Sequence, residues 1–198
     1  MTPNRLRNFA SSTLLRLLHG RSFGHLGKGS RIVRPAGIER PDRIFIDDDV
    51  FIAPLTGLQV YDQQDAGRLD IARGCKIGRF NHIYALGRVS LGEKVLTANG
   101  VYISDNTHDF ADIDTAIMDQ PIKQLGETAI GDGTWIGHNA VVFGARIGRN
   151  CVIAANSVVS HDIPDCSVVV GVNRIVKRYD SVTRSWRATA SDGAFDTD

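Results

Sequence analysis

The chain has 198 residues and a formal net charge of +1, from 23 lysines and arginines against 22 aspartates and glutamates. This balance lacks the basic excess typical of nucleic-acid-binding proteins, and a hydrophobic content of 42% argues against disorder. The length favours one domain with at most a short appendage. Glycine is enriched, with 20 residues or about 10% of the chain against an average of about 7%, whereas proline contributes six. Glycine without proline indicates many tight corners rather than a flexible linker.

The first twenty residues predict a short amphipathic helix. They contain Arg5, Arg7 and Arg16 and a short apolar run that Arg16 interrupts, with no small-residue cleavage site after it. A signal peptide is therefore not expected, and the sequence has no apolar stretch long enough for a transmembrane segment. We expect the helix to pack on its own domain or on a partner subunit. A peripheral membrane contact through the three arginines is the alternative.

Three cysteines, Cys75, Cys151 and Cys166, occur without CxxC spacing. An odd number in this arrangement encodes neither a disulfide framework nor a zinc knuckle. Free thiols fit a reducing compartment, so we expect a cytoplasmic protein.

A six-residue repeat dominates the middle of the chain. Of its fourteen leading positions, thirteen are aliphatic and Thr97 is the exception. The next residue is small or Asp at twelve of the fourteen, and the two exceptions are Tyr84 and Phe143. The leading positions are Ile46, Ile52, Ile71, Ile77, Ile83, Leu91, Thr97, Ile103, Ile130, Ile136, Val142, Ile147, Ile153 and Val159.

A period of six is not helical, because residues i and i+6 lie on opposite sides of an α-helix. In a strand, the same period keeps these residues on one face. Three hexads form one turn of a triangular coil, with the aliphatic residue inside and the small residue at the corner. Such coils stack through parallel ladders into a solenoid. The corner positions account for five of the surplus glycines: Gly78, Gly92, Gly131, Gly137 and Gly148.

Residues 71–164 resemble the left-handed parallel β-helix of the hexapeptide-repeat acyltransferases. The likeness is carried by IGDGTWIGHNAVV (130–142), IGRNCVIAANSVVSHDIP (147–164) and GVNRIVK (171–177), where Asn173 and Arg174 replace a Pro-Ala of the family. ISDNTHDF (103–110) and the excursion after it are similar to the branch that O-acetylates sugars of capsules, exopolysaccharides and lipopolysaccharide. The left hand is taken from the resemblance, because spacing does not give it.

The resemblance implies an all-β chain in three parts. We expect an N-terminal helical appendage at 1–30, a left-handed β-helix catalytic domain at 31–170 and a C-terminal extension at 171–198. The excursion loop at 109–129 carries five acidic residues and one basic residue. In the family this excursion leans over a site between two subunits, so the resemblance also implies a homotrimer.

His108 is the predicted general base. Acyl transfer to a hydroxyl needs a base, because the alcohol proton must leave as the new bond forms, and a neutral imidazole suits this near pH 7. In the family the histidine of this motif is that base, and no acyl-enzyme forms. Asn81 or Asn106 is expected to donate a hydrogen bond to the developing oxyanion, and the sequence does not choose between them.

The resemblance also implies sites for the acceptor and for acetyl-CoA, the acyl donor. His82, Asp105 and Trp135 are the predicted acceptor residues, and Trp135 has interface packing as its alternative role. Coenzyme A needs small residues along its pantetheine arm and basic groups at its phosphates. No metal is expected. The predicted cofactor residues are Trp135, Gly137, His138, Ala155, Ser157, Ser160, Arg174 and Lys177.

The expected activity is acetyl transfer from acetyl-CoA to a sugar hydroxyl in exopolysaccharide, capsule or lipopolysaccharide biosynthesis. A small non-polysaccharide hydroxyl or amine is an alternative acceptor. A γ-class carbonic anhydrase would need three zinc-binding histidines, two of them close in sequence, yet His138 and His161 are 23 residues apart. A non-catalytic scaffold would not need to interrupt its coils after ISDNTH. A sugar nucleotidyltransferase would need a Rossmann-like domain for which this chain has no room.

Overall fold

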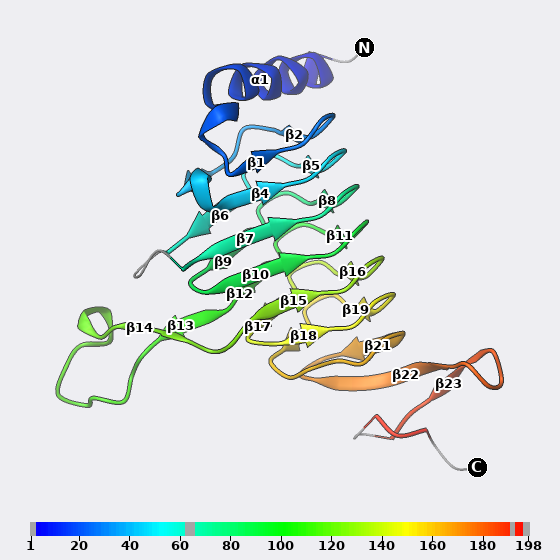
Figure 1. Cartoon of the computed structure of the whole chain (residues 1–198). Coiled ribbons are helices and arrows are strands. Elements are labelled where there is room, and N and C mark those ends of the chain that lie inside the picture. Colours follow the sequence, from blue (N-terminus) through cyan, green and yellow to red (C-terminus); the bar gives the residue numbers. More distant parts are fainter. Residues whose placement is uncertain (1–2, 62–65, 191–192, 196–198) are drawn as a thin grey trace.

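The computed structural model describes residues 3–61, 66–190 and 193–195. They form a triangular prism of stacked coils, with a helix across one end and an antiparallel extension at the other (Figure 1). Three parallel sheets, here called faces A, B and C, make the sides of the prism, and each strand pairs with its equivalent in the next coil. The predicted parallel β-helix is confirmed.

The strands of each face follow one another along the prism axis. Face A contains β1 (His25–Leu26), β4 (Ile44–Ile46), β7 (Arg68–Ile71), β10 (Arg88–Leu91), β15 (Thr128–Ile130) and β18 (Arg146–Ile147). Face B contains β2 (Arg31–Ile32), β5 (Phe51–Ile52), β8 (Lys76–Ile77), β11 (Leu96–Thr97), β16 (Trp135–Ile136), β19 (Val152–Ile153), β21 (Ser167–Val170), β22 (Arg174–Asp180) and β23 (Ser185–Ala188). Face C contains β3 (Gly37–Glu39), β6 (Gly57–Val60), β9 (His82–Ala85), β12 (Tyr102–Ser104), β17 (Val141–Phe143) and β20 (Val158–Val159).

The remaining elements lie at the ends and in the excursion. They are α1 (Pro3–His19), the short 3-10 helices η1 (Gly20–Ser22), η2 (Pro41–Arg43) and η3 (Ile117–Asp119), and the hairpin strands β13 (Asn106–His108) and β14 (Ile122–Gln124). In the part of the chain that the structure describes, no helix is both long and apolar enough to cross a membrane.

The hexad positions form the core of the prism. All fourteen are buried, with at most 3% of their surface exposed. The parallel ladders stack them in columns: on face A, Ile71 pairs with Leu91, Leu91 with Ile130, and Ile130 with Ile147. The sequence period therefore identified the inward-facing residues, because alternate strand positions share a face.

Close stacking of the coils explains the corner glycines. A Cβ on Gly131 would lie 2.5 Å from the backbone nitrogen of Arg149, and one on Gly137 would lie 2.6 Å from that of Ala155. No side chain fits at such distances, so the glycine surplus belongs to the solenoid.

Thr97, the polar exception among the hexads, serves as an internal hydrogen-bonding group. It is 2% exposed, and its Oγ1 accepts hydrogen bonds from the backbone N–H of Gly78 at 3.0 Å and from Nδ2 of Asn81. The Oδ1 of Asn81 in turn accepts the backbone N–H of Val101 at 2.8 Å. This pair therefore ties together two adjacent coils.

Thr97→Val is expected to lower the free energy of unfolding by about 2 kcal/mol, although valine has nearly the same shape and is more apolar. The reason is that two donors, the part-buried Gly78 N–H and the buried Asn81 Nδ2, lose their acceptor. Urea denaturation would measure the change, with Thr97→Ser as the control that keeps the hydroxyl. A Thr97→Val protein at least as stable as the Ser variant would contradict this role.

The cysteines are free thiols, as expected from their spacing. Cys75 and Cys151 are buried in the prism. Burial raises the pKa of the Cys75 thiol to about 11 and also raises the pKa of Cys151, so neither is a ready nucleophile.

Both ends of the prism are closed by non-coil segments. The Arg16 guanidinium of α1 donates to the carbonyl oxygens of Leu26, Gly27 and Ser30 at 3.2, 2.7 and 2.8 Å, which ties the helix to the first coil. At the other end β22 and β23 continue face B as antiparallel strands. β1 begins at residue 25 and β21 ends at residue 170, while residues 1–2, 191–192 and 196–198 of the predicted appendages lie outside the described residues.

Candidate active site

A β-hairpin positions His108 at the root of the excursion. The chain leaves the coil after β12 and returns at β15. In between, β13 pairs antiparallel with β14, so that His108 lies opposite Ile122 and Asn106 opposite Gln124. The backbone N–H of Asp109 extends this pairing by donating to the carbonyl of Pro121 at 3.0 Å. His108 therefore stands on a hydrogen-bonded strand rather than on a free loop.

The outer part of the excursion is organised around Gln120. Its side chain is only 9% exposed, and its Nε2 donates to the carbonyl oxygens of Asp112 and Thr115 at 2.7 and 2.8 Å. The Oε1 of the same side chain accepts the backbone N–H of Asp112 at 3.2 Å. These three bonds close the loop on itself and leave its apolar side chains pointing outwards.

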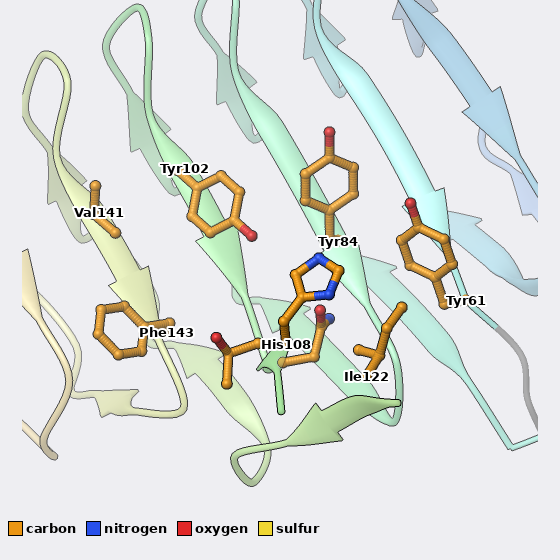
Figure 2. Close-up of a pocket in the computed structure, with 9 residues that line it drawn as sticks. Tyr61, Tyr84, Tyr102, His108, Ile122, Val141 and Phe143 are labelled. Carbon is orange, nitrogen blue, oxygen red and sulfur yellow. The ribbon is translucent and has the colours of Figure 1, made fainter. Parts of the chain in front are cut away.

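His108 lines a pocket of about 460 Å³ between the hairpin and face C. Figure 2 shows its imidazole projecting from the hairpin towards the rings of Tyr84 and Tyr61, with Ile122 beside it. The complete lining is Tyr61, Tyr84, Tyr102, Asn106, Thr107, His108, Ile122, Val141 and Phe143. The pocket therefore combines one imidazole, hydroxyl and amide groups, and an apolar rim.

Three tyrosines from consecutive coils form a ladder along the pocket. The ring centres of Tyr61 and Tyr84 are 6.2 Å apart, and those of Tyr84 and Tyr102 are 5.6 Å apart. His82 touches this ladder, because its Nδ1 lies 3.0 Å from the hydroxyl of Tyr84. Burial raises the pKa of Tyr84, which keeps its hydroxyl protonated at neutral pH.

The ladder was not among the predicted site residues, although the sequence contained a signal for part of it. Tyr84 and Phe143 are the two large residues in the hexad positions that are otherwise small or Asp, and both line the pocket. Each side chain sits where the regular corner is broken and projects outwards on face C (Figure 2). The two exceptions to the small-residue position of the repeat therefore both lie at the pocket, although we did not predict them as site residues.

Asp105 supports the site from inside the prism. It is fully buried, and its carboxylate accepts the backbone N–H groups of Leu86, Gly87 and Arg88 at 2.7, 2.8 and 2.7 Å. It also accepts Nδ2 of Asn106 at 3.0 Å. We predicted that Asp105 binds the sugar substrate, but Asp105 does not line the pocket. Its oxygens instead bond the backbone at the corner between β9 and β10.

The two candidate oxyanion donors occupy different environments. Asn106 lies on β13 and lines the pocket. Asn81 is fully buried, with its amide engaged by Thr97 and Val101, and is not among the lining residues. The structure thus brings only Asn106 to His108.

Several predicted cofactor residues stack at the corner between faces B and C. Gly137 and His138 occupy this corner in one coil, and Ala155 occupies it in the next, where the N–H of Asn156 donates to the carbonyl of His138 at 2.8 Å. The backbone N–H of Val158, in the coil of Ala155, donates to the carbonyl of Gly171 at 2.8 Å. The segment that begins at Gly171 therefore lies against this coil. The corner leads into β17, whose Val141 and Phe143 line the His108 pocket.

Two predicted cofactor serines differ in their surroundings. Ser157 is fully buried, so its side chain does not reach the surface of this corner. The backbone N–H and Oγ of Ser160 are bonded to Oδ1 and Nδ2 of Asn173 at 2.7 and 2.9 Å. Arg174 and Lys177 are exposed on β22, as phosphate-binding side chains must be.

Trp135 lies on another face of the prism. It belongs to β16 of face B, is 46% exposed and has Leu96 as its strand neighbour, itself 45% exposed. A single chain does not bring Trp135 to the pocket of His108, which opens on face C.

Among the described residues, His25, Asp47 and Asp48 form the one cluster whose potential metal ligands lie within 4.8 Å of one another. Both carboxylates already bond the backbone: Asp48 accepts the N–H of Lys28 at 2.6 Å and Asp47 that of Asp48 at 2.7 Å. None of the three lines the His108 pocket.

Comparison with known proteins defines the class of this prism. Residues 127–161 match the family model described as the hexapeptide repeat of succinyl-transferase. Among solved structures, AntD, an N-acyltransferase from Bacillus cereus in complex with dTDP-4-amino-4,6-dideoxyglucose and coenzyme A, superposes with a TM-score of 0.70. It is 20% identical, and the match covers 85% of this chain and 91% of that one. The fold is the predicted left-handed parallel β-helix.

Two curated relatives carry the comparison further. The chain is 32% identical over 160 residues to the probable acetyltransferase Rv3034c of Mycobacterium tuberculosis, covering 70% of this chain and 52% of that protein. It is also 32% identical over 119 residues to WbbJ of Escherichia coli, whose name describes a lipopolysaccharide biosynthesis O-acetyl transferase, covering 56% and 61%. The chain thus spans little more than half the length of these relatives. Residues 127–161 thus carry the hexapeptide repeat, and the chain is similar to acetyltransferases along most of its length.

Proposed function

We propose that the protein is an O-acetyltransferase that moves the acetyl group of acetyl-CoA to a sugar hydroxyl. The observation that carries the proposal is the position of His108, held by the β13–β14 hairpin over the tyrosine ladder of face C. The names of the relatives agree with this chemistry, since one is called a lipopolysaccharide biosynthesis O-acetyl transferase. AntD, which shares the fold, has been crystallised with coenzyme A and an amino-sugar nucleotide.

In the proposed reaction the imidazole of His108 accepts the proton of the acceptor hydroxyl. The hydroxyl oxygen attacks the thioester carbonyl, the C–O bond forms and the C–S bond breaks. The proton on His108 then passes to the departing thiolate of coenzyme A, so that no acyl-enzyme is required. Asn106 lines the pocket, and in this proposal the N–H of its amide that does not bond Asp105 donates to the oxyanion that develops on the carbonyl oxygen.

The tyrosine ladder supports a sugar as the acceptor. The flat faces of Tyr84 and Tyr102 suit the C–H faces of a pyranose ring, while their hydroxyls and Asn106 offer hydrogen bonds at its edges. The hydrogen bond between Nδ1 of His82 and the hydroxyl of Tyr84 holds the Tyr84 ring in its orientation. Capsule, exopolysaccharide and lipopolysaccharide sugars fit the proposal, with a small hydroxyl or amine compound as the alternative acceptor.

We propose that acetyl-CoA, the acyl donor, binds along the corner between faces B and C. His138 and Ala155 are exposed along it, and Arg174 and Lys177 offer positive charge beyond the last coil for the phosphates of acetyl-CoA. Gly137 and Ser157 are buried at this corner, and Ser160 follows β20 in the same coil as Ala155.

A homotrimer would complete the site. The excursion exposes Phe110, Ile113, Ile117 and Met118, whose exposed fractions are 70, 94, 55 and 83%. An apolar group of this size favours cover by another chain. A neighbouring prism would also bring a face B, with Trp135, towards the face C pocket. The free thiols fit the reducing cytoplasm as the location of this reaction.

The test is the release of CoA thiol from acetyl-CoA with a panel of hexoses, hexosamines and nucleotide sugars. We expect acceptor-dependent release and a product ester that mild alkali cleaves, whereas transfer to an amine would yield an alkali-resistant amide. No release with any hydroxyl or amine acceptor would favour a non-catalytic scaffold and contradict the proposal.

A further inference from the structure

The N-terminal end of the prism presents a leucine surface to solvent. α1 lies across this end (Figure 1). Its inner side contains Arg16, which bonds the first coil, Leu15, which packs against the core, and Ser12, which is 6% exposed. Its outer side is the leucine face, defined here by four residues that are 56–77% exposed: Leu6, Leu14, Leu17 and Leu18.

The helical period places most of this leucine face opposite the packed side. Leu6, Leu14 and Leu17 are separated by eight and three residues, which keeps them on one stripe of a 3.6-residue helix. Such a stripe normally faces the core of a domain. Here the side with Ser12, Leu15 and Arg16 faces the prism, and the leucine face points outwards.

The same end of the chain carries a concentrated positive charge. Residues 1–38 contain seven basic residues and no acidic residue, and Glu39 is the first acid. The remaining 160 residues hold 16 basic against 22 acidic residues, so the near-neutral chain is strongly asymmetric. The seven basic residues are Arg5, Arg7, Arg16, Arg21, Lys28, Arg31 and Arg34.

Six of these seven side chains are exposed, Arg16 being the exception. In the described part of the chain, none of the seven forms an ion pair with a carboxylate. Arg31 lies 5.3 Å from the centre of the Phe9 ring, and Arg34 donates to the Asn8 side chain at 3.2 Å. The positive charge therefore lies on and beside the helix, and within the described residues no ion pair neutralises it.

We propose that α1 docks the protein on an anionic lipid membrane, with the leucine face in the headgroup–acyl boundary and the basic residues on the phosphates. An apolar face flanked by arginines has the chemistry of helices that lie in the membrane interface. Each basic residue near an anionic surface strengthens binding by about fivefold. A second copy of this chain fits less well, because it would bring two basic surfaces together.

The direct test is co-sedimentation of the full chain with vesicles of phosphatidylglycerol and phosphatidylcholine, compared with phosphatidylcholine alone. We expect binding to the anionic vesicles only, with a steep loss as salt is added. Leu14→Gln/Leu17→Gln is expected to weaken binding about a hundredfold or more, because two leucines no longer enter the apolar boundary, each worth about a tenfold factor or more. Arg7→Gln/Arg21→Gln is expected to weaken binding and flatten its salt dependence.

Val182→Gln is the matched control. Val182 is 90% exposed in the turn between β22 and β23 at the opposite end of the prism, so its variant should bind like the wild type. Equal sedimentation with both kinds of vesicle, or none with either, would overturn the proposal. So would a lipid-free assembly that dissociates in Leu14→Gln/Leu17→Gln, because protein would then cover the face. Thiol release measured without vesicles tests the enzymatic proposal separately.

Discussion

Replacement of His108 with alanine is expected to lower acceptor-dependent release of CoA thiol by about 10²- to 10⁴-fold. The acceptor hydroxyl would keep its pocket but lose the group that takes its proton. Because His108 is exposed on the hairpin, the substitution should leave the free energy of unfolding nearly unchanged. Steady-state thiol release and urea denaturation of the same preparation measure the two quantities.

The matched control for His108 is His19→Ala. His19 ends α1, is also exposed and does not line the His108 pocket. Its removal should leave thiol release at the wild-type rate. If His108→Ala released thiol as fast as His19→Ala with a competent acceptor, His108 would not be the general base.

The second large effect is expected at Asp105. Asp105→Ala should lower the free energy of unfolding by about 4 kcal/mol, because three backbone N–H groups and the Asn106 amide lose a charged acceptor that is itself buried. It should also lower thiol release in the protein that remains folded, since Asn106 and His108 directly follow Asp105 on the hairpin. Urea denaturation measures the first effect, and the slope of the transition verifies that unfolding stays two-state.

Asp132→Ala provides the comparison for Asp105. Asp132 is exposed and accepts one backbone N–H, that of Glu93 at 2.7 Å. Its loss should cost about 1 kcal/mol. If both variants lost the same free energy of unfolding, the buried carboxylate of Asp105 would not stabilise the corner between β9 and β10 as inferred.

The prism could be predicted from the sequence, whereas the tyrosine ladder could not. The hexad period reports burial at each strand and therefore predicted all fourteen inward positions, Thr97 included. It does not report which outward side chains of different coils become neighbours. Tyr61, Tyr84 and Tyr102 are separated by 23 and 18 residues, and only the stacking of β6, β9 and β12 brings their rings together.

Residue type alone was also a poor guide to whether a polar side chain faces the pocket or the interior. Asn81, Asp105 and Ser157 had the chemistry of site residues, but all three are fully buried. Asn81 and Asp105 form hydrogen bonds with backbone or core groups of adjacent coils. These partners come together only when the coils stack. Asn106 has similar chemistry and reaches the pocket, because it lies on the hairpin that leaves the coil.

The sequence by itself determined the repeat, the inward residues, the glycine corners and the motif that contains His108, because each of these depends on local spacing along one strand or turn. The tertiary structure decided the rest. Pairing of β13 with β14 directs His108 towards the tyrosine ladder, the B–C corner aligns His138 with Ala155, and the packing of Arg16 leaves the leucine face of α1 exposed. These arrangements join residues far apart in the chain, and their contacts form only when coils, hairpin and helix are stacked in space.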